Sequence, residues 1–439
     1  MQSSPIYIPT DSSYAELGSQ CLSPKTDTSA QEPDEFENSV LDYTDRSYTS
    51  TRKKTHYGES ASSPAEKLSK AQLLSEQYIK DNEFLRANKE LIRCVALSRI
   101  VHGDGHWKLA QAFANLGHSY LIFRELPAQA RQHAESAKNI LLRGVDMSNS
   151  VEDKREILET LVTIYYTLGI KVYILNCPTG KESYLSLQKV EKIVEELDEL
   201  QETKSVMLKI SEKDIAVALG MACLQQNKPS SARNYFEQAV NLVIASEGDS
   251  APELIDLYRN LAKTEQLRKK HDKAIEYLLQ AVSISHATYN KPSIESAETE
   301  LLLAKAYAAS GNSNYEEAAE KCFKESLGVY QTVLGPDDQL TLNACIEYSK
   351  WLIQIGNKKE AYSLLHEAMI SDAEFSEIGA DILSIMGSIC LSDGNVVKGY
   401  KLLKKCLGIQ TVVYGTQHTK SRETQKILDT LKKSGGIKE

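Results

Sequence analysis

The sequence predicts an all-α fold in which paired helices stack into a solenoid, a superhelix of repeats about 42 residues long, preceded by a disordered N-terminal tail. Three observations predict this fold. From about residue 66 helical patterns follow one another, without runs of alternating β-branched residues. A small residue recurs at a nearly regular interval within them, and a loop that usually contains glycine recurs between the repeats.

The first segment, residues 1–65, carries ten acidic and five basic residues and is rich in Ser, Thr and Pro. It shows no helical or alternating period, so it cannot bury enough apolar area to offset its chain entropy. We therefore predict a disordered acidic tail over 1–65, a solenoid over 66–433, and a flexible C-terminus over 434–439. The opening "MQSSPIYIPTDSS" has no basic segment followed by an apolar run, so no signal peptide is expected.

Composition excludes several classes of function. The formal net charge is −9, which argues against nucleic acid as a partner because that interaction needs a basic surface. No stretch approaches about 18 uninterrupted apolar residues, so no membrane insertion is expected. The eight cysteines form no CxxC pair, which favours free thiols in a reducing compartment. The chain is accordingly predicted to be cytoplasmic.

The small residue that recurs can be used as an anchor for each repeat. Most anchors follow one another at an interval close to the repeat length, but the second and third intervals are longer. These two long intervals flank residues 142–156 and 176–182, and a hinge is predicted near 142–156. The eight anchors predict about eight helix pairs, and they are Ser75, Gly117, Gly169, Gly220, Ala262, Ala304, Ser349 and Gly387.

In five repeats a second small residue follows its anchor by 12 positions. Two antiparallel helices approach closely only where side chains are small, so each such pair marks a helix crossing. The spacing resembles the tetratricopeptide repeat, as does the turn glycine Gly356, which follows Ser349 by seven positions. The usual period of that repeat is about 34 residues. The longer period seen here resembles the repeats of kinesin light chains. The second small residues are Ala87, Ala232, Ala274, Ala361 and Gly399.

The segment "VHGDGHW" (101–107) is the one that most resembles a chemical site, because it holds His102 and His106. However, its Gly103 belongs to a loop that recurs, since a glycine or asparagine stands at the same distance before four of the anchors and once more after the last helix pair. Such a residue predicts a left-handed conformation that ends one helix, followed by a cap for the next. The loop is thus interpreted as structural. The residues at this place are Gly103, Gly248, Asn290, Gly335 and Gly415.

A metal-dependent enzyme that uses His102 and His106 remains the alternative of another class. The two histidines have no counterparts in most copies of the loop, although His418 matches His106. No GxxxxGK[ST], GxSxG or HExxH motif occurs. We therefore predict that the chain is not an enzyme and needs no cofactor or metal.

A binding face is predicted on the first helices of the pairs, which line the concave side of such a solenoid. The residue after each anchor is expected to point into this groove. In three successive repeats that residue is Lys263, Lys305 or Lys350, and Arg259 lies one turn before Lys263. These four cations predict a groove for acidic peptide segments of a protein partner.

Two segments carry a closer resemblance. Residues 87–121, "ANKELIRCVALSRIVHGDGHWKLAQAFANLGHSYL", and residues 414–424, "YGTQHTKSRET", are similar to the family of tetratricopeptide repeat protein 23 and its 23-like paralogue. The similarity runs from about residue 66 to 432 and is nearer to the paralogue. The resemblance implies a non-enzymatic cytoplasmic protein linked to microtubule structures, namely the centrosome, the midbody or the cilium.

The sequence therefore favours a scaffold that holds a partner peptide or helix in its groove. A kinesin-light-chain-like cargo adaptor is the alternative within the binding class, but residues 1–65 contain no heptad coiled coil with which to join a motor. A further hypothesis is that the acidic segment "QEPDEFEN" (31–38) covers Lys263, Lys305 and Lys350 and thereby masks them.

Overall fold

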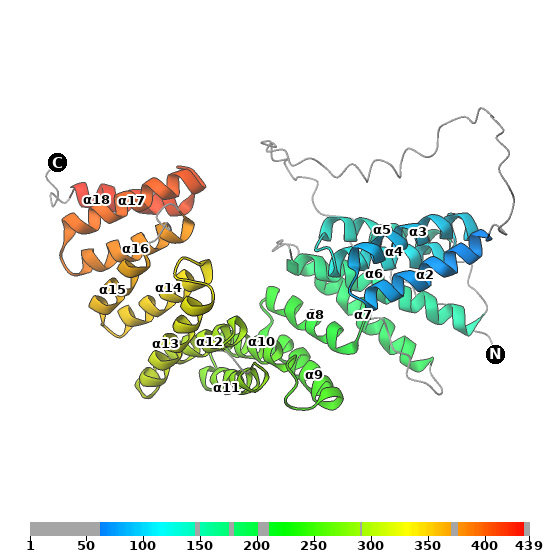
Figure 1. Ribbon diagram of the computed structural model, residues 1–439, viewed down its shortest axis with the longest axis horizontal. Helices are drawn as coiled ribbons and strands as arrows, with labels where there is room; N and C mark the ends of the chain where they lie inside the picture. The colour runs from blue at the N-terminus through cyan, green and yellow to red at the C-terminus, as the bar shows by residue number, and fades with distance from the viewer. Residues whose placement is uncertain are drawn as a thin grey trace. The chain divides into compact units, whose positions relative to one another are not determined.

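A computed structural model describes residues 62–144, 150–174, 180–200, 210–289, 292–369 and 376–433. Within these ranges it contains seventeen α-helices, one short 3₁₀ helix and no strand, which confirms the all-α fold (Figure 1). The chain divides into two compact units, Met1–Thr167 and Leu168–Glu439.

The first unit is built from helices that pack against their neighbours in the sequence. Helix α2 packs on α3 and α4 on α5, and α3 contacts α4 to join the two pairs. The apolar contact between α2 and α3 contains Leu68, Ala71 and Cys94, all buried. The helices are α2 (Pro64–Lys80), α3 (Phe84–His102), α4 (Trp107–Ile122), α5 (Pro127–Gly144) and α6 (Val151–Ile174), and the division between the units falls within α6.

The second unit repeats the same arrangement. The first helices of successive pairs also contact each other, α10 with α12, α12 with α14 and α14 with α16, so they share one side of the stack. Its first four helices are α7 (Gly180–Glu199), α8 (Glu212–Gln225), α9 (Pro229–Glu247) and α10 (Leu254–Leu267). Then follow α11 (His271–Thr288), α12 (Ile294–Ser310), η2 (Ser313–Tyr315), α13 (Glu316–Val333) and α14 (Gln339–Gln354). The last are α15 (Lys358–Ala368), α16 (Glu377–Ser392), α17 (Val396–Tyr414) and α18 (Thr419–Lys433).

The predicted anchors lie at the crossings within the pairs. A Cβ atom added to Gly117 of α4 would lie 2.9 Å from the carbonyl oxygen of Ala130 of α5. A Cβ atom on Gly220 would lie 2.7 Å from the ring of Phe236, the apolar residue expected 16 positions later. Only glycine allows such close approach at these two positions, so the small-residue pattern identified the helix contacts correctly.

The turn inside a pair has a recurrent backbone geometry. Where the structure describes it, the residue seven positions after the anchor has positive φ in six repeats, and glycine supplies it in three of them, including Gly356 (φ 88°). In the α8–α9 turn, for example, the Lys228 N–H donates to the Cys223 carbonyl and closes a Schellman motif. The other positive-φ residues at this position are Asn82, Asn227, Lys269, Gly311 and Gly394.

The glycines of the loop between pairs have backbone angles that differ from the prediction. Gly103, Gly248 and Gly415 have φ of 85°, 93° and 85°, but their ψ values are 172°, 175° and 164°. These angles are not those of the left-handed helical conformation that was expected. They belong to a region that is essentially restricted to glycine, in which the chain turns and immediately becomes extended. Asn290 lies outside the described residues.

Several predicted boundaries fall outside the parts that the structure describes. Residues 1–61 of the expected tail, residues 145–149 of the expected hinge and residues 434–439 are among them. Helix α2 begins at Pro64, slightly before the expected start of the solenoid at residue 66. Its N-cap is Ser63, whose side chain accepts from the Glu66 N–H at 3.2 Å, while the Ser63 N–H donates to the Glu66 carboxylate at 2.9 Å. This capping box satisfies two backbone donors and so fixes the N-terminus of α2 at Pro64.

Candidate functional site: the first-helix face of the second unit

The lysines predicted to line a groove occupy equivalent places on α10, α12 and α14. The anchors Ala262 and Ala304 are almost fully buried against the partner helices. Each lysine follows its anchor by one residue, and Lys263, Lys305 and Lys350 are all exposed. Because α12 contacts both α10 and α14, the three ammonium groups lie on one face of adjacent first helices.

One carboxylate joins two of these lysines. Glu347 lies 3.0 Å from the Lys305 ammonium and 2.8 Å from the Lys350 ammonium. Burial by itself would raise the pKa of Glu347, but hydrogen bonds from Lys350 and Lys305 outweigh burial and lower the pKa below its ordinary value. Glu347 is therefore ionised and offsets part of the lysine charge. Lys263 forms no ion pair within the parts of the chain that the structure describes.

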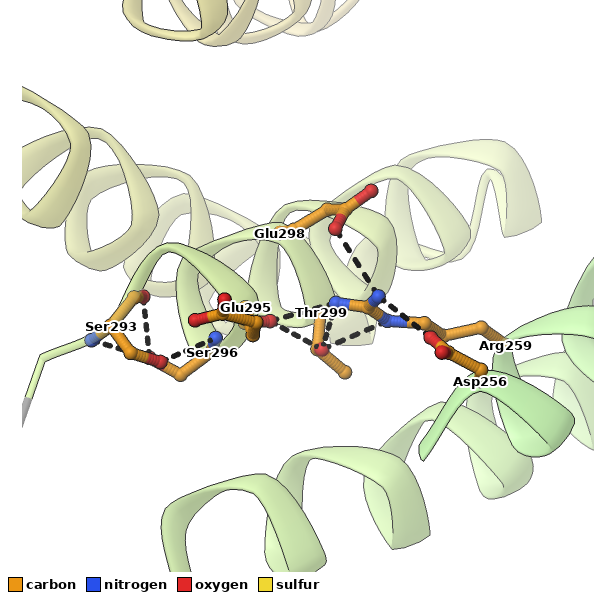
Figure 2. A network of polar contacts seen from close by, with 7 residues as sticks. All are labelled: Asp256, Arg259, Ser293, Glu295, Ser296, Glu298 and Thr299. Carbon is orange, nitrogen blue, oxygen red and sulfur yellow. Dashed lines mark hydrogen bonds and ion pairs between the residues drawn. The ribbon is translucent and has the colours of Figure 1, made fainter. Parts of the chain in front are cut away.

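Arg259 has a different environment from the lysines, because its side chain is only 14% exposed. Figure 2 shows its guanidinium reaching from α10 to α12. It donates to the Thr299 hydroxyl at 2.6 and 3.0 Å and to the Glu295 carbonyl at 2.7 Å. It also pairs with Asp256 at 3.1 Å and Glu298 at 3.2 Å.

Thr299, which accepts from Arg259, is itself buried and hydrogen-bonded within α12. Thr299 is fully buried, and its hydroxyl donates to the Glu295 carbonyl at 2.8 Å while accepting from Arg259. The start of α12 is fixed by a second polar group, in which Ser293 and Ser296 cap each other (Figure 2). Arg259 thus ties two successive first helices together, and most of its hydrogen-bonding capacity is already used.

Similar ties recur along this face. Lys213 of α8 pairs with Glu253, the residue before α10, and Lys420 of α18 lies 3.3 Å from Asp381 of α16. In each case a cation from one repeat meets a carboxylate of an adjacent repeat. These contacts were not found from the sequence, because single charges one repeat apart give no signal until the repeats are superposed in space.

A cleft opens on the same face between the starts of α14 and α16, with a volume of about 600 Å³. Its lining includes the carboxylates of Asp337, Glu377 and Asp381 beside polar and apolar residues, and Lys420 pairs with Glu377 and Asp381. The face therefore changes from lysine-bearing on α10–α14 to acidic at α16. The lining residues are Asp337, Gln339, Leu342, Asn343, Ser376, Glu377, Ile378 and Asp381.

The histidines of the loop 101–107 are held by helix capping and ring stacking. His106 is the N-cap of α4, and its Nδ1 accepts from the Lys108 N–H at 3.1 Å. His418 holds the equivalent place before α18, where its Nδ1 accepts from the Lys420 N–H at 3.3 Å. The His102 ring stacks on His106 with centroids 5.0 Å apart. The correspondence of His106 and His418 found in the sequence is therefore a shared capping role.

No group of three or more His, Cys, Asp or Glu side chains that could hold a metal ion occurs among the residues the structure describes. The cysteines in those residues form no disulfide, and burial raises the pKa of Cys223, Cys345 and Cys406 to about 11. Such thiols pack as small apolar groups and are poor nucleophiles at neutral pH.

None of the helices in the described ranges is both long enough and apolar enough to span a lipid bilayer.

Known proteins share both the fold and the sequence pattern. A family model of the tetratricopeptide repeat matches residues 214–242, which cover most of α8 and α9. The crystal structure of the apo form of RapI aligns with a TM-score of 0.52 and 11% identity, over 84% of this chain and 97% of that chain. That likeness shows the solenoid fold and nothing further.

Two curated relatives are similar over most of their length. Tetratricopeptide repeat protein 23-like from Mus musculus is 46% identical over 373 residues, which cover 84% of this chain and 81% of the relative. Tetratricopeptide repeat protein 23 from Homo sapiens is 32% identical over 374 residues, which cover 84% of this chain and 82% of the relative. The chain therefore belongs to the family of tetratricopeptide repeat protein 23 and its 23-like paralogue.

Proposed function

We propose that the first-helix face of α10, α12 and α14 binds an acidic peptide segment of a protein partner. Membership of a tetratricopeptide family supports a protein-interaction scaffold as the general role. The observation that carries the finer proposal is the equivalent placement of Lys263, Lys305 and Lys350, each exposed directly after a buried anchor. Three ammonium groups on adjacent helices can meet successive carboxylates of one extended peptide.

The carboxylate of Glu347 affects how strongly each lysine can bind an acidic peptide. The Lys263 ammonium can pair directly with a carboxylate of the peptide, whereas Lys305 and Lys350 already share Glu347. A bound peptide must exchange with Glu347 or add to the same cluster. Exposed ion pairs contribute only about 0.2–1 kcal/mol each, so the lysines would set partner selectivity and association rate more than affinity.

The test is affinity purification and mass spectrometry from ciliated cells with three baits. One is the wild-type chain, and the second carries K263Q, K305Q and K350Q. The third carries K321Q, K324Q and K359Q, which removes the same charge from exposed positions on α13 and α15. Glutamine is chosen because a glutamate at position 305 or 350 would repel Glu347.

We expect a discrete set of partners to be lost with the first triple variant and kept with the second, while circular dichroism shows unchanged helicity for both. A partner set that is the same for all three baits would contradict the proposed face.

We further propose that the scaffold works at microtubule structures, namely the centrosome, midbody or cilium base, as the family resemblance implies. The test is imaging of the tagged full chain beside markers of these three structures. Enrichment at one of them is the expected result, and uniform distribution through the cytoplasm at low expression would contradict it.

A further inference from the structure

The turn between α12 and α13 is longer than the turns in which the second small residue follows its anchor by 12 positions. Ala304 and Ala319 are both buried in one core cluster, and here the spacing is 15 positions. The longer turn begins at Gly311, which ends α12 with a φ of 64°, and it contains the 3₁₀ helix η2. At the end of η2, Tyr315 lies against Tyr307 of α12, with ring centroids 5.0 Å apart.

A pocket of about 210 Å³ opens beside this turn, between the ends of α12 and α14, and is called the turn pocket below. It is smaller than the roughly 300–1,000 Å³ of pockets that hold a whole small molecule, so its size suits a single side chain of a partner. Three aromatic rings, one carboxylate and two side-chain amides contribute to its lining. They belong to Tyr307, Tyr315, Trp351, Glu316, Asn312 and Gln354.

The charges and dipoles around the turn pocket favour a cation. Glu316 is the one charged residue among the described residues of the lining, and it forms no ion pair within the ranges that the structure describes. Gly311 and Ile355, the C-caps of α12 and α14, also line the pocket. A helix C-terminus carries partial negative charge, and its last carbonyls lack intrahelical donors. The positive N-terminus of α13 is offset by Glu316 and Glu317 in its first turn.

The aromatic rings of the turn pocket can add to this attraction. A cation over the face of an aromatic ring is attracted by the quadrupole of the ring, and this chain uses that contact elsewhere, because Lys398 lies 4.3 Å from the centre of the Tyr362 ring. In the parts of the chain that the structure describes, no lysine or arginine lies over the three rings of the turn pocket. These rings can therefore receive a cation from another molecule.

Among cationic side chains, arginine fits this lining best. Its guanidinium is planar, weakly hydrated and able to stack on aromatic rings, and it carries five N–H donors. Glu316 and the side-chain oxygens of Asn312 and Gln354 supply acceptors. The Asn312 Oδ1 atom accepts from the Asn314 N–H at 3.0 Å and can accept a second hydrogen bond. A lysine ammonium is strongly hydrated and loses more when it leaves water.

We propose that the turn pocket binds an arginine side chain of a protein partner. The guanidinium stacks against the ring of Tyr307 or Tyr315 and pairs with the carboxylate of Glu316. The proposal goes beyond the partner face of Lys263, Lys305 and Lys350 and does not require it, because the turn pocket shares no residue with those lysines.

The turn pocket nevertheless lies next to the partner face. Ala308 of its lining follows Lys305 by three positions on α12. Gln354 of its lining follows Lys350 by four positions on α14, and residues three or four apart are neighbours on a helix surface. Glu347 offsets part of the charge of both lysines, which reduces their repulsion of a cation in the pocket. A partner segment that carries both carboxylates and an arginine would contact both sites.

The test uses the full chain with Trp107→Phe, in which Trp351 is the one tryptophan and reports on the turn pocket. The probes are N-acetylarginine methylamide, the citrulline analogue, which is neutral and similar in shape, and the lysine analogue. At constant ionic strength the arginine probe should change the Trp351 fluorescence saturably, with a dissociation constant of about 1–10 mM. The citrulline analogue should bind about tenfold more weakly or less, because it cannot form a charged pair with Glu316.

Two matched variants test the carboxylate. E316Q removes it from the turn pocket, whereas E317Q removes the same charge from the next residue, which is exposed and does not line the pocket. E316Q should weaken binding of the arginine probe by about fivefold or more, and E317Q by less than about twofold. Tyr315→Leu keeps an apolar side chain but removes the ring, and it should also weaken binding. Circular dichroism checks that the variants remain helical.

The proposal is wrong if the arginine probe gives no saturable change up to about 50 mM, or if the citrulline analogue binds as well. It is also wrong if E316Q and E317Q have the same effect, and equal binding of the lysine analogue would overturn the assignment to arginine. The triple variant K263Q/K305Q/K350Q should not weaken binding of the arginine probe. Failure of the turn pocket can thus be distinguished from failure of the partner face, which is tested by partner capture.

Discussion

Among the residues that the structure describes, four that carry side chains adopt positive φ in the turns within helix pairs, at 50–59°. They are Asn82, Glu125, Asn227 and Lys269. The left-handed conformation costs about 1–2 kcal/mol for a residue with a Cβ atom, and asparagine tolerates it better than lysine or glutamate. From sequence this turn was recognised at Gly356, whereas these four turns contain no glycine, so residue type does not mark them.

The turn at Lys269 leads to a first prediction. Lys269→Gly should raise the free energy of unfolding by about 0.5–1 kcal/mol, because the strain relieved exceeds the added flexibility of the unfolded chain. Chemical denaturation measures the change. Lys270→Gly is the control, since Lys270 has a φ of −101° and gains nothing from glycine. Equal effects of the two substitutions would contradict the strain at position 269.

The stacked histidines lead to a second prediction, on pH. Burial, followed by the charges of His106 and Lys108, lowers the pKa of His102 below its ordinary value. The unfolded chain then binds a proton more readily than the folded chain, so this contribution to stability is present above about pH 6.5 and is lost as the pH falls below it. The melting temperature should decrease between about pH 7.5 and 5.5, and His102→Gln should make that decrease smaller. A decrease as large in the variant as in the wild type would show that His102 is not responsible.

Some residue roles were accessible from sequence and others were not. The sequence predicted a cap for the next helix shortly after Gly103 and matched His106 with His418, but only the structure shows that the histidine itself is the cap. The ψ values of the loop glycines could not be predicted, because the residue type allows several positive-φ conformations. The pairing of Glu347 with Lys305 and Lys350 was also inaccessible, since it depends on how neighbouring repeats are rotated against each other.

At the scale of elements, the crossing of two helices depends on a few contacts. The anchor pattern located the close crossings at Gly117 and Gly220, where an added Cβ atom would meet the partner helix. A period of small residues is a strong signal, because close approach leaves no room for larger side chains. The polar ties between pairs, such as that of Arg259 with Thr299, carry no comparable period.

Two glycine-to-alanine substitutions provide a matched third prediction. Gly117→Ala should lower the free energy of unfolding by about 1–3 kcal/mol, because its Cβ would meet the Ala130 carbonyl oxygen and separate α4 from α5. Gly408→Ala has nothing within 4 Å of the added Cβ and lies within α17. It should raise the free energy by about 0.5–1 kcal/mol, because alanine restricts the unfolded chain. Denaturation of both variants measures the difference, and a gain in both would contradict the close crossing at Gly117.

At the scale of the whole molecule, stability is expected to be distributed along the chain. Helices pack mainly on neighbours in the sequence, as in other repeat proteins, so parts of such a chain can unfold separately. The two tryptophans report on different units, because Trp107 lies in α4 and Trp351 in α14. Both side chains are almost fully buried.

The fourth prediction uses this distribution. Trp107→Phe and Trp351→Phe each leave one tryptophan, whose fluorescence follows the unfolding of its own unit in denaturant. The two midpoints should differ, and circular dichroism of the wild type should show a broader transition than either fluorescence curve. Coincident midpoints by all probes would instead show that the chain unfolds as one cooperative body.

The loop between pairs has a consequence for how such a chain can change its length. Caps for the next helix stand at His106, Ser293, Asp338 and His418, so the loops that contain them start the following helix by themselves. A gene segment that ends at these loops can therefore be duplicated or lost without leaving an uncapped helix. Contacts such as that of Arg259 with Thr299 oppose such changes, because each of them requires a particular residue in the next repeat. Loops that carry such a cap therefore permit the number of repeats to change, whereas ties between first helices favour particular neighbours.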